Sequence, residues 1–128
     1  MRRVLDASAL LAALQNEPGA ERVGATLDAA VISTVNLAEV VAGLARNGAT
    51  EKEVRAAISM ASVTAIAPDE EMAIDAGLLR AITDKAGLSL GDRFCLALAR
   101  RLRAPALTAD RKWAEVVADT GVPIELIR

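Results

Sequence analysis

The feature that most constrains the fold of this chain is a regular alternation of short apolar runs with longer helical segments. The runs have the length and composition of buried strands, and they occupy residues 2–6, 30–33, 62–67, 104–109 and 122–127. Strands separated by helices predict a mainly parallel sheet of about four or five strands with helices on both faces. We therefore expect a three-layer α/β/α architecture.

The segments between these runs are predicted to be helical, and several end at a helix-stopping signal such as Asn47–Gly48. The expected helices span residues 7–15, 19–29, 36–46, 50–60, 70–85, 90–102 and 111–119. No internal repeat, linker or low-complexity segment interrupts them. A chain of 128 residues can bury an ordinary core, so we expect one domain over residues 1–128.

The amino-acid counts exclude several classes of chemistry. The chain has no histidine and one cysteine, so imidazole-based catalysis, histidine-ligated metals, internal disulfides and multi-cysteine zinc sites are ruled out. Aromatic residues are only 2% of the total, which argues against a module that reads single-stranded nucleic acid by base stacking. Neither a dinucleotide fingerprint nor a phosphate-binding P-loop is present.

The charge pattern also bears on location. No uncharged run reaches the roughly 18 residues that a membrane span requires. Asp6 interrupts the apolar run that follows Arg2 and Arg3, so we expect no secretory signal and a reduced, cytoplasmic setting.

Four acidic residues stand at predicted junctions between strands and helices. Asp6 and Asp110 end the first and fourth apolar runs, and Glu39 is the only charge in the stretch VISTVNLAEVVAGLA. Asp92 lies in the first turn of its helix, on a stripe with Leu88, Cys95 and Leu96. In an open parallel sheet, ligands bind outside the carboxyl ends of the strands, so these acids are expected to gather at one edge.

Each of the four acids also fits an ordinary structural role. Asn36 to Glu39 and Ser89 to Asp92 both have the spacing of a capping box, in which an acidic side chain bonds back to the residue before the helix. Asp6 and Asp110 could each cap the helix that follows. For any one residue, capping and function are about equally good interpretations.

A histidine-free group of carboxylates suits hard cations such as Mg²⁺ or Mn²⁺. The segment from Lys85 to Lys112 holds seven basic and two acidic residues, a net charge of +5 in a chain whose total is −2. A basic surface beside carboxylates is compatible with a polyanionic ligand, although a solvated arginine-rich helix would have the same charge count. Phosphodiester hydrolysis is the simplest chemistry that uses both features.

Four stretches resemble, in order and spacing, the motifs of the PIN-domain ribonucleases, and most closely those of VapC toxins from bacterial toxin–antitoxin pairs. The stretches are VLDASALLAAL, ISTVNLAEVVAGL, GLSLGDRFCLALA and ALTADRKWAEV. The resemblance implies that one or two Mg²⁺ or Mn²⁺ ions are coordinated by the acidic residues Asp6, Glu39, Asp92 and Asp110. Asp6 and Asp92 would be the most direct ligands, and Glu39 and Asp110 would act partly through water.

The resemblance also assigns supporting residues. Ser8 and Thr108 fall where the family carries hydroxyls that support the site, although both also fit ordinary capping or turn roles. Arg93 and Arg111 adjoin site carboxylates and are candidates for phosphate contact, with solvation as the more ordinary interpretation. We interpret Trp113 as a packing residue and Cys95 as a core residue.

By this resemblance the chain is an endoribonuclease toxin that inhibits translation, forms a homodimer and binds a small cognate antitoxin in addition to RNA. Two alternatives stay open at this stage. One is a catalytically silent PIN-like protein that only binds partners. The other is a receiver-like signalling domain, which is disfavoured because Asp6 has no acidic neighbour and the fourth run, APALTA, lacks a lysine.

Overall fold

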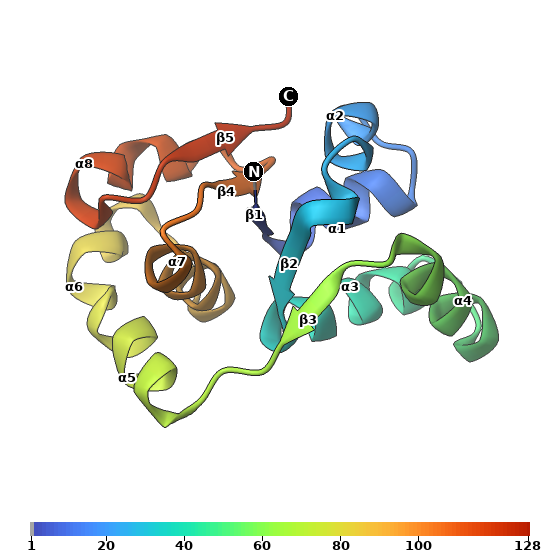
Figure 1. Cartoon of the computed structure of the whole chain (residues 1–128), viewed down its shortest axis with the longest axis horizontal. Helices are drawn as coiled ribbons and strands as arrows, with labels where there is room; N and C mark the ends of the chain where they lie inside the picture. Colours follow the sequence, from blue (N-terminus) through green and yellow to red (C-terminus); the bar gives the residue numbers. More distant parts are fainter. Residues whose placement is uncertain (1) are drawn as a thin grey trace.

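A computed structural model describes residues 2–128 and shows strands and helices in alternation (Figure 1). The strands are β1 (Arg3–Leu5), β2 (Ala30–Ser33), β3 (Thr64–Ile66), β4 (Ala106–Thr108) and β5 (Ile124–Leu126). The α-helices are α1 (Ala7–Leu14), α2 (Ala20–Gly24), α3 (Thr34–Arg46), α4 (Glu51–Ala61), α5 (Glu70–Leu78), α6 (Arg80–Thr83), α7 (Leu90–Leu102) and α8 (Val117–Thr120). Three short 3-10 helices complete the set: η1 (Leu27–Ala29), η2 (Asp84–Ala86) and η3 (Arg111–Val116). No helix within residues 2–128 is long and apolar enough to cross a membrane.

The five strands form one sheet in the order β3-β2-β1-β4-β5, and all four pairings are parallel. The predicted parallel α/β sheet is therefore confirmed. The chain builds β1, β2 and β3 outward in one direction, then crosses back to place β4 on the other side of β1. The strand order thus reverses between β1 and β4. A receiver-like domain has a different order, in which its third strand adjoins the first, so that alternative is wrong.

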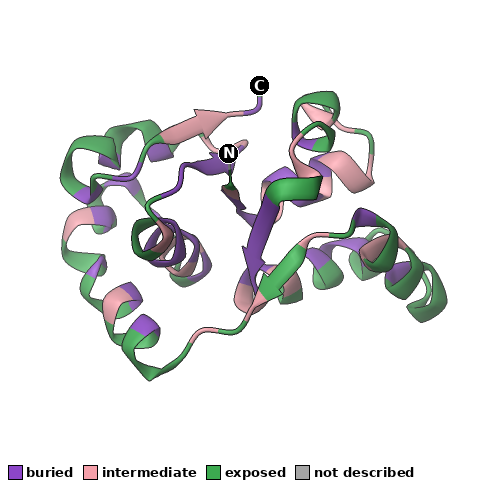
Figure 2. Cartoon of the chain, viewed as in Figure 1, coloured by how far each residue is buried: buried purple, intermediate pink, exposed green. Residues whose placement is uncertain are grey.

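The two faces of the sheet bury separate cores, because successive side chains of a strand point to opposite faces. Val4 and Val31 pack with residues of α5 and α7 in one core. Leu5 and Ile32 pack with residues of α1, α3 and α4 in the other. In Figure 1 the two groups of helices lie on opposite sides of the sheet, and Figure 2 shows β2 buried while the edge strand β3 is exposed. The three-layer prediction is confirmed.

Helix α3 begins two residues earlier than predicted. Its N-cap is Ser33, whose Oγ accepts the backbone N–H of Val35 at 3.2 Å. Asn36 is consequently inside the helix, and the capping-box interpretation of Asn36 and Glu39 is wrong. The N-caps predicted at Asp6, Ser89 and Asp110 are all present.

Three predicted helices, 19–29, 70–85 and 111–119, are divided into shorter α and 3-10 segments. Threonine hydroxyls bond back to the main chain in these regions: Thr26 donates to Val23 O at 2.7 Å, Thr83 to Leu79 O at 2.8 Å, and Thr120 to Val116 O at 2.7 Å. Bonds of this kind can bend a helix slightly. They accompany the divisions without replacing the backbone bonds, since the Thr83 N–H still donates to Leu79 O at 3.1 Å.

Candidate metal centre

The candidate site lies at the point where the strand order reverses. Asp6 follows β1 and Asp110 lies two residues beyond β4, so both stand at the carboxyl ends of the two strands flanking the switch. The backbone N–H of Asp6 donates to Leu107 O at 3.1 Å and ties the end of β1 to β4. Ligands of open α/β sheets bind in the crevice at such a position.

Asp6 is held by three donors. Its Oδ1 accepts the Ser8 hydroxyl at 2.7 Å and the Ala9 backbone N–H at 2.8 Å, and its Oδ2 accepts the Thr108 hydroxyl at 2.5 Å. The carboxylate is only 4% exposed. The structure thus brings both predicted supporting hydroxyls, Ser8 and Thr108, onto Asp6 and fixes its orientation.

The same two hydroxyls connect Asp6 to the segment that carries Asp110. Ser8 Oγ accepts the Ala109 N–H at 2.9 Å, and Thr108 Oγ1 accepts the Asp110 N–H at 3.0 Å. Asp110 itself caps η3, because its Oδ1 accepts the Lys112 N–H at 3.0 Å. Asp110 is therefore connected to Asp6 through a hydroxyl.

Burial raises the pKa of Asp6 to about 6. The hydrogen bonds from Thr108, Ala9 and Ser8 lower it, and the negative charge of Asp92 raises it further. Within residues 2–128, no lysine or arginine forms an ion pair with Asp6. A buried carboxylate without a cation is costly, so Asp6 is a place where a positive ion is favoured.

Glu39 approaches the first turn of α7 from α3. Its Oε1 accepts Asn36 Nδ2 at 2.8 Å, and the same nitrogen donates to Gly91 O at 3.0 Å. A Cβ built on Gly91 would lie 2.5 Å from Glu39 Oε2, which shows how closely the carboxylate packs on that backbone. Glu39 and the N-terminus of α7 are thus in direct contact.

Asp92 lies one residue farther along α7 and forms a capping box with Ser89. Asp92 Oδ2 accepts the Ser89 N–H at 2.8 Å, and Ser89 Oγ accepts the Asp92 N–H at 3.2 Å. Burial raises the pKa of the Cys95 thiol, and the charges of Asp6, Asp92 and Glu39 raise it further. Three of the four predicted acids therefore lie near enough to Cys95 to act on its pKa.

These donors fit a hydrated hard cation. Among residues 2–128, no three acidic or cysteine side chains are close enough together to hold an ion directly. Mg²⁺ usually keeps several waters and takes only one or two carboxylates, all through oxygen. The assignment of Asp6 and Asp92 as direct ligands, and of Glu39 and Asp110 as ligands through water, stays a prediction. The arrangement does not fit an ion enclosed by side chains alone.

The predicted basic residues flank the carboxylates. Arg93 Nε donates to Ser89 O at 3.3 Å, and Arg111 is exposed at the start of η3. Lys112 places its Nζ 3.9 Å from Asp110 Oδ2. It was not predicted as a residue of the candidate site, although its position directly after Asp110 and Arg111 could have indicated it. Trp113 and Cys95 are both fully buried, which confirms their interpretation as core residues.

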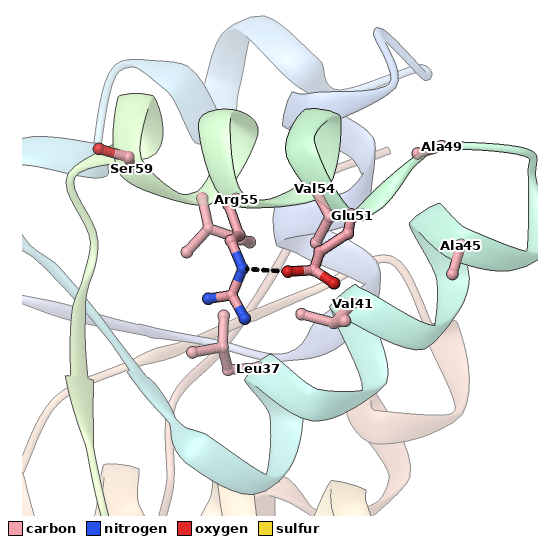
Figure 3. Close-up of a pocket in the computed structure, with 9 residues that line it drawn as sticks. Leu37, Val41, Ala45, Ala49, Glu51, Val54, Arg55 and Ser59 are labelled. Atoms are coloured by element: carbon pink, nitrogen blue, oxygen red, sulfur yellow. Dashed lines mark hydrogen bonds and ion pairs between the residues drawn. The ribbon is translucent and has the colours of Figure 1, made fainter.

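A hollow that is separate from these acids lies between α3 and α4 (Figure 3). It has a volume of about 640 Å³ and an apolar wall that includes Leu37, Val41 and Val54. Arg55 and Glu51 form an ion pair at 3.0 Å beside it. None of the four candidate acids lines this groove.

The PIN domain matches residues 3–119 of the sequence. The chain belongs to the PIN-domain family. The structure is similar to the DNA-bound VapBC of Salmonella typhimurium, with a TM-score of 0.78, 21% identity, and coverage of 100% of this chain and 99% of that one. It is also similar to VapBC-1 of nontypeable Haemophilus influenzae, with a TM-score of 0.71 and 23% identity. That match covers 99% of this chain and 98% of the other.

A third similar solved structure is that of VapC20 from Mycobacterium tuberculosis, a toxin that cleaves the sarcin-ricin loop. It has a TM-score of 0.71 and 15% identity over 88% of this chain and 92% of that one. No curated protein matches the sequence. The predicted PIN domain is confirmed, and its fold is similar to the folds of VapBC and VapC structures.

Proposed function

We propose that this PIN domain is a Mg²⁺- or Mn²⁺-dependent endoribonuclease, the toxin of a toxin–antitoxin pair that inhibits translation by cutting RNA. The observation that carries the proposal is Asp6, a buried carboxylate at the switch point of the sheet that has no ion-pair partner among residues 2–128. Asp92 and Glu39 approach the same core residue from α7 and α3. Membership of the PIN family agrees with this function.

The mechanism assigns a part to each residue of the site. A bound divalent cation would supply Lewis acidity and an activated water for in-line attack on the phosphodiester. Ser8, Ala9 and Thr108 hold the Asp6 carboxylate in one orientation, so that it need not reorganise during the reaction. Asp92 would be the second direct ligand, while Glu39 and Asp110 would hold the ion through water.

Basic residues at the rim suit an RNA backbone. Arg93, Arg111 and Lys112 follow or flank the site acids and lie in the segment with net charge +5. Cations of this kind bind phosphates without reading the base sequence. We therefore assign them to positioning the substrate, while the carboxylates hold the metal.

We also propose a cognate antitoxin as the partner, because similar structures include the VapBC of Salmonella typhimurium and a toxin–antitoxin complex from Klebsiella pneumoniae. The apolar groove between α3 and α4 is the surface suited to a partner helix with one apolar face (Figure 3). A homodimer in the cytoplasm, with residues 1–128 acting as one domain, completes the proposal.

The decisive experiment is cleavage of a structured RNA pool by the purified chain with Mg²⁺ or Mn²⁺, beside EDTA and the folded Asp92→Asn variant. We expect discrete cuts that require both the metal and Asp92. A folded chain that binds Mn²⁺ without cutting any RNA would instead indicate a catalytically silent binding protein. Equal cutting by Asp92→Asn would contradict the site assignment.

A further inference from the structure

Asn36 is a buried amide at the junction of α3 and α7. It is 1% exposed, and its Nδ2 donates to Glu39 Oε1 at 2.8 Å and to Gly91 O at 3.0 Å. A carboxylate and a backbone carbonyl can only accept hydrogen bonds, so the amide nitrogen must face both of them. Asn36 thus bonds simultaneously to a site carboxylate and to the backbone of the helix that carries Asp92.

Gly91 completes this contact by having no side chain. A Cβ there would lie 2.5 and 2.6 Å from the two carboxylate oxygens of Glu39. The glycine is therefore required by the close approach of Glu39, since any side chain would occupy the place of the carboxylate. The Asn36 amide and the open space at Gly91 together fix one position for Glu39.

The orientation of Asn36 leaves its own Oδ1 without a donor among residues 2–128. A buried acceptor without a partner destabilises a fold, and an apolar residue of the same shape would remove that penalty. The two bonds made by Nδ2 are consequently the reason for an amide at this position. Both of them act on the candidate metal centre.

We infer that Asn36 is a positioning residue that holds Glu39 against Gly91 and thereby sets the affinity of the site for its divalent cation. The inference rests on the proposed function and goes beyond it by assigning metal affinity to a residue that is not itself a ligand. Partners of this kind, behind metal ligands, are typically worth about 10- to 100-fold in metal affinity.

The first test measures Mn²⁺ binding to the purified chain by electron paramagnetic resonance, which does not depend on cleavage. Asn36→Leu keeps the branched shape and removes both donors, so we expect the Kd for Mn²⁺ to rise by about 10-fold or more. The matched control is Asn47→Leu at the other end of α3, where an exposed amide donates to the Gln15 side chain at 2.7 Å. An unchanged Kd in folded Asn36→Leu overturns the inference.

The second test approaches the same contact from α7. Gly91→Ala places a methyl group where the Glu39 carboxylate lies. The Kd of this variant for Mn²⁺ should therefore rise, as for Asn36→Leu. Gly77→Ala, in α5, is the matched control because no atom lies within 4 Å of a Cβ added there. Circular dichroism of all four variants separates loss of metal affinity from loss of folding.

A double-mutant cycle shows whether Asn36 acts through Glu39. In a Glu39→Ala background, Asn36→Leu and Gly91→Ala should cause no further change in the Mn²⁺ Kd, because the carboxylate they position is gone. Full additivity would overturn the inference. A wild-type chain that binds no Mn²⁺ would overturn the proposed function as well, whereas unchanged variants of a Mn²⁺-binding chain would overturn only the role of Asn36.

Discussion

Two helices of this protein begin with the same cap and place it in opposite surroundings. Asp69 caps α5 and Asp6 caps α1, and each carboxylate accepts a backbone N–H three residues on at 2.8 Å. Asp69 is exposed and receives both terminal nitrogens of Arg101, and these bonds lower its pKa. Asp6 is buried without an ion-pair partner in the described chain, and its pKa rises to about 6. The same local motif stabilises at one site and creates a need for a cation at the other.

The capping boxes repeat this contrast. Thr50 with Glu53 starts α4, and Ser89 with Asp92 starts α7, with hydrogen bonds of the same pattern. Glu53 faces solvent, whereas Asp92 contributes with Asp6 and Glu39 to the electrostatics around Cys95. A carboxylate that caps a helix can therefore also lie among other acids, as the proposed metal binding by Asp92 requires. The neighbours of the cap make this difference.

The largest expected effect separates the two capping-box acids. Asp92→Asn should lower the rate of RNA cleavage by more than about 100-fold, since even residues behind metal ligands are worth about 10- to 100-fold. Glu53→Gln should leave the rate unchanged. Single-turnover cleavage of one RNA by the two variants, both shown to be folded, measures this difference. An equal loss of rate in the two variants would contradict a special role for Asp92.

The next effect concerns stability and separates the two N-cap aspartates. Asp6→Asn should raise the free energy of unfolding of the metal-free protein at pH 7 by up to about 3 kcal/mol, because a pKa shift of about two units is worth that much. Asp69→Asn should lower it, since the charge paired with Arg101 is lost. Urea unfolding with EDTA present measures both.

The pH dependence of the Asp6→Asn difference has a definite sign. The folded state holds the Asp6 proton up to about pH 6, while the unfolded chain releases it near 3.8. The contribution of Asp6 to stability is thus most favourable below about pH 4 and is lost as the pH rises toward 6. The gain from Asp6→Asn should therefore grow between pH 4 and 7, and a gain that shrinks over this range would contradict the burial of a lone carboxylate.

A smaller effect is expected from the hydroxyl caps. Ser89→Ala and Thr50→Ala should each lower the free energy of unfolding by about 1 kcal/mol. Only Ser89→Ala should also slow cleavage, because Ser89 orients Asp92. Denaturant unfolding and cleavage rates are measured on the same preparations of the two variants. An equal loss of cleavage in both variants would contradict the role of Ser89 in orienting Asp92.

The smallest effect concerns two arginines, Arg93 in the first turn of α7 and Arg55 in α4. Arg93→Ala should raise KM for RNA roughly two- to five-fold and reduce the slope of log KM against log salt by about 0.7, the value for one phosphate contact on a single strand. Arg55→Ala, in α4, should change neither quantity. A salt series of the two variants measures both, and equal slopes would return Arg93 to a solvated surface role.

The main features of the fold could be predicted because they follow from periodicity. Alternating runs indicate strands and crossover helices, and this alternation is enough to predict a parallel sheet with helices on both faces. The division of the expected helices 19–29, 70–85 and 111–119 into shorter segments could not be predicted, because it depends on tertiary packing. The cap of α3 at Ser33 rather than Asn36 depended on which of two nearby polar residues bonds to the first turn.

The candidate site could be predicted only in part. Asp6 and Asp110 follow from the rule that ligands gather at strand ends, and Asp92 from its place on an apolar stripe. The role of Asn36 could not be read from the sequence, because its two acceptors, Glu39 and Gly91 O, come from separate helices. Likewise, the need for glycine at position 91 arises from a contact with Glu39 and not from an unusual backbone angle.

The hydrogen bond from Thr108 to Asp6 joins residues 102 positions apart in the sequence. During synthesis, the first strand and its aspartate leave the ribosome long before the fourth strand exists to pair with them. A nascent chain therefore carries Asp6, Glu39 and Asp92 without the element that completes their site. The Asp6 carboxylate therefore gains its Thr108 hydrogen bond only after most of the chain has been translated.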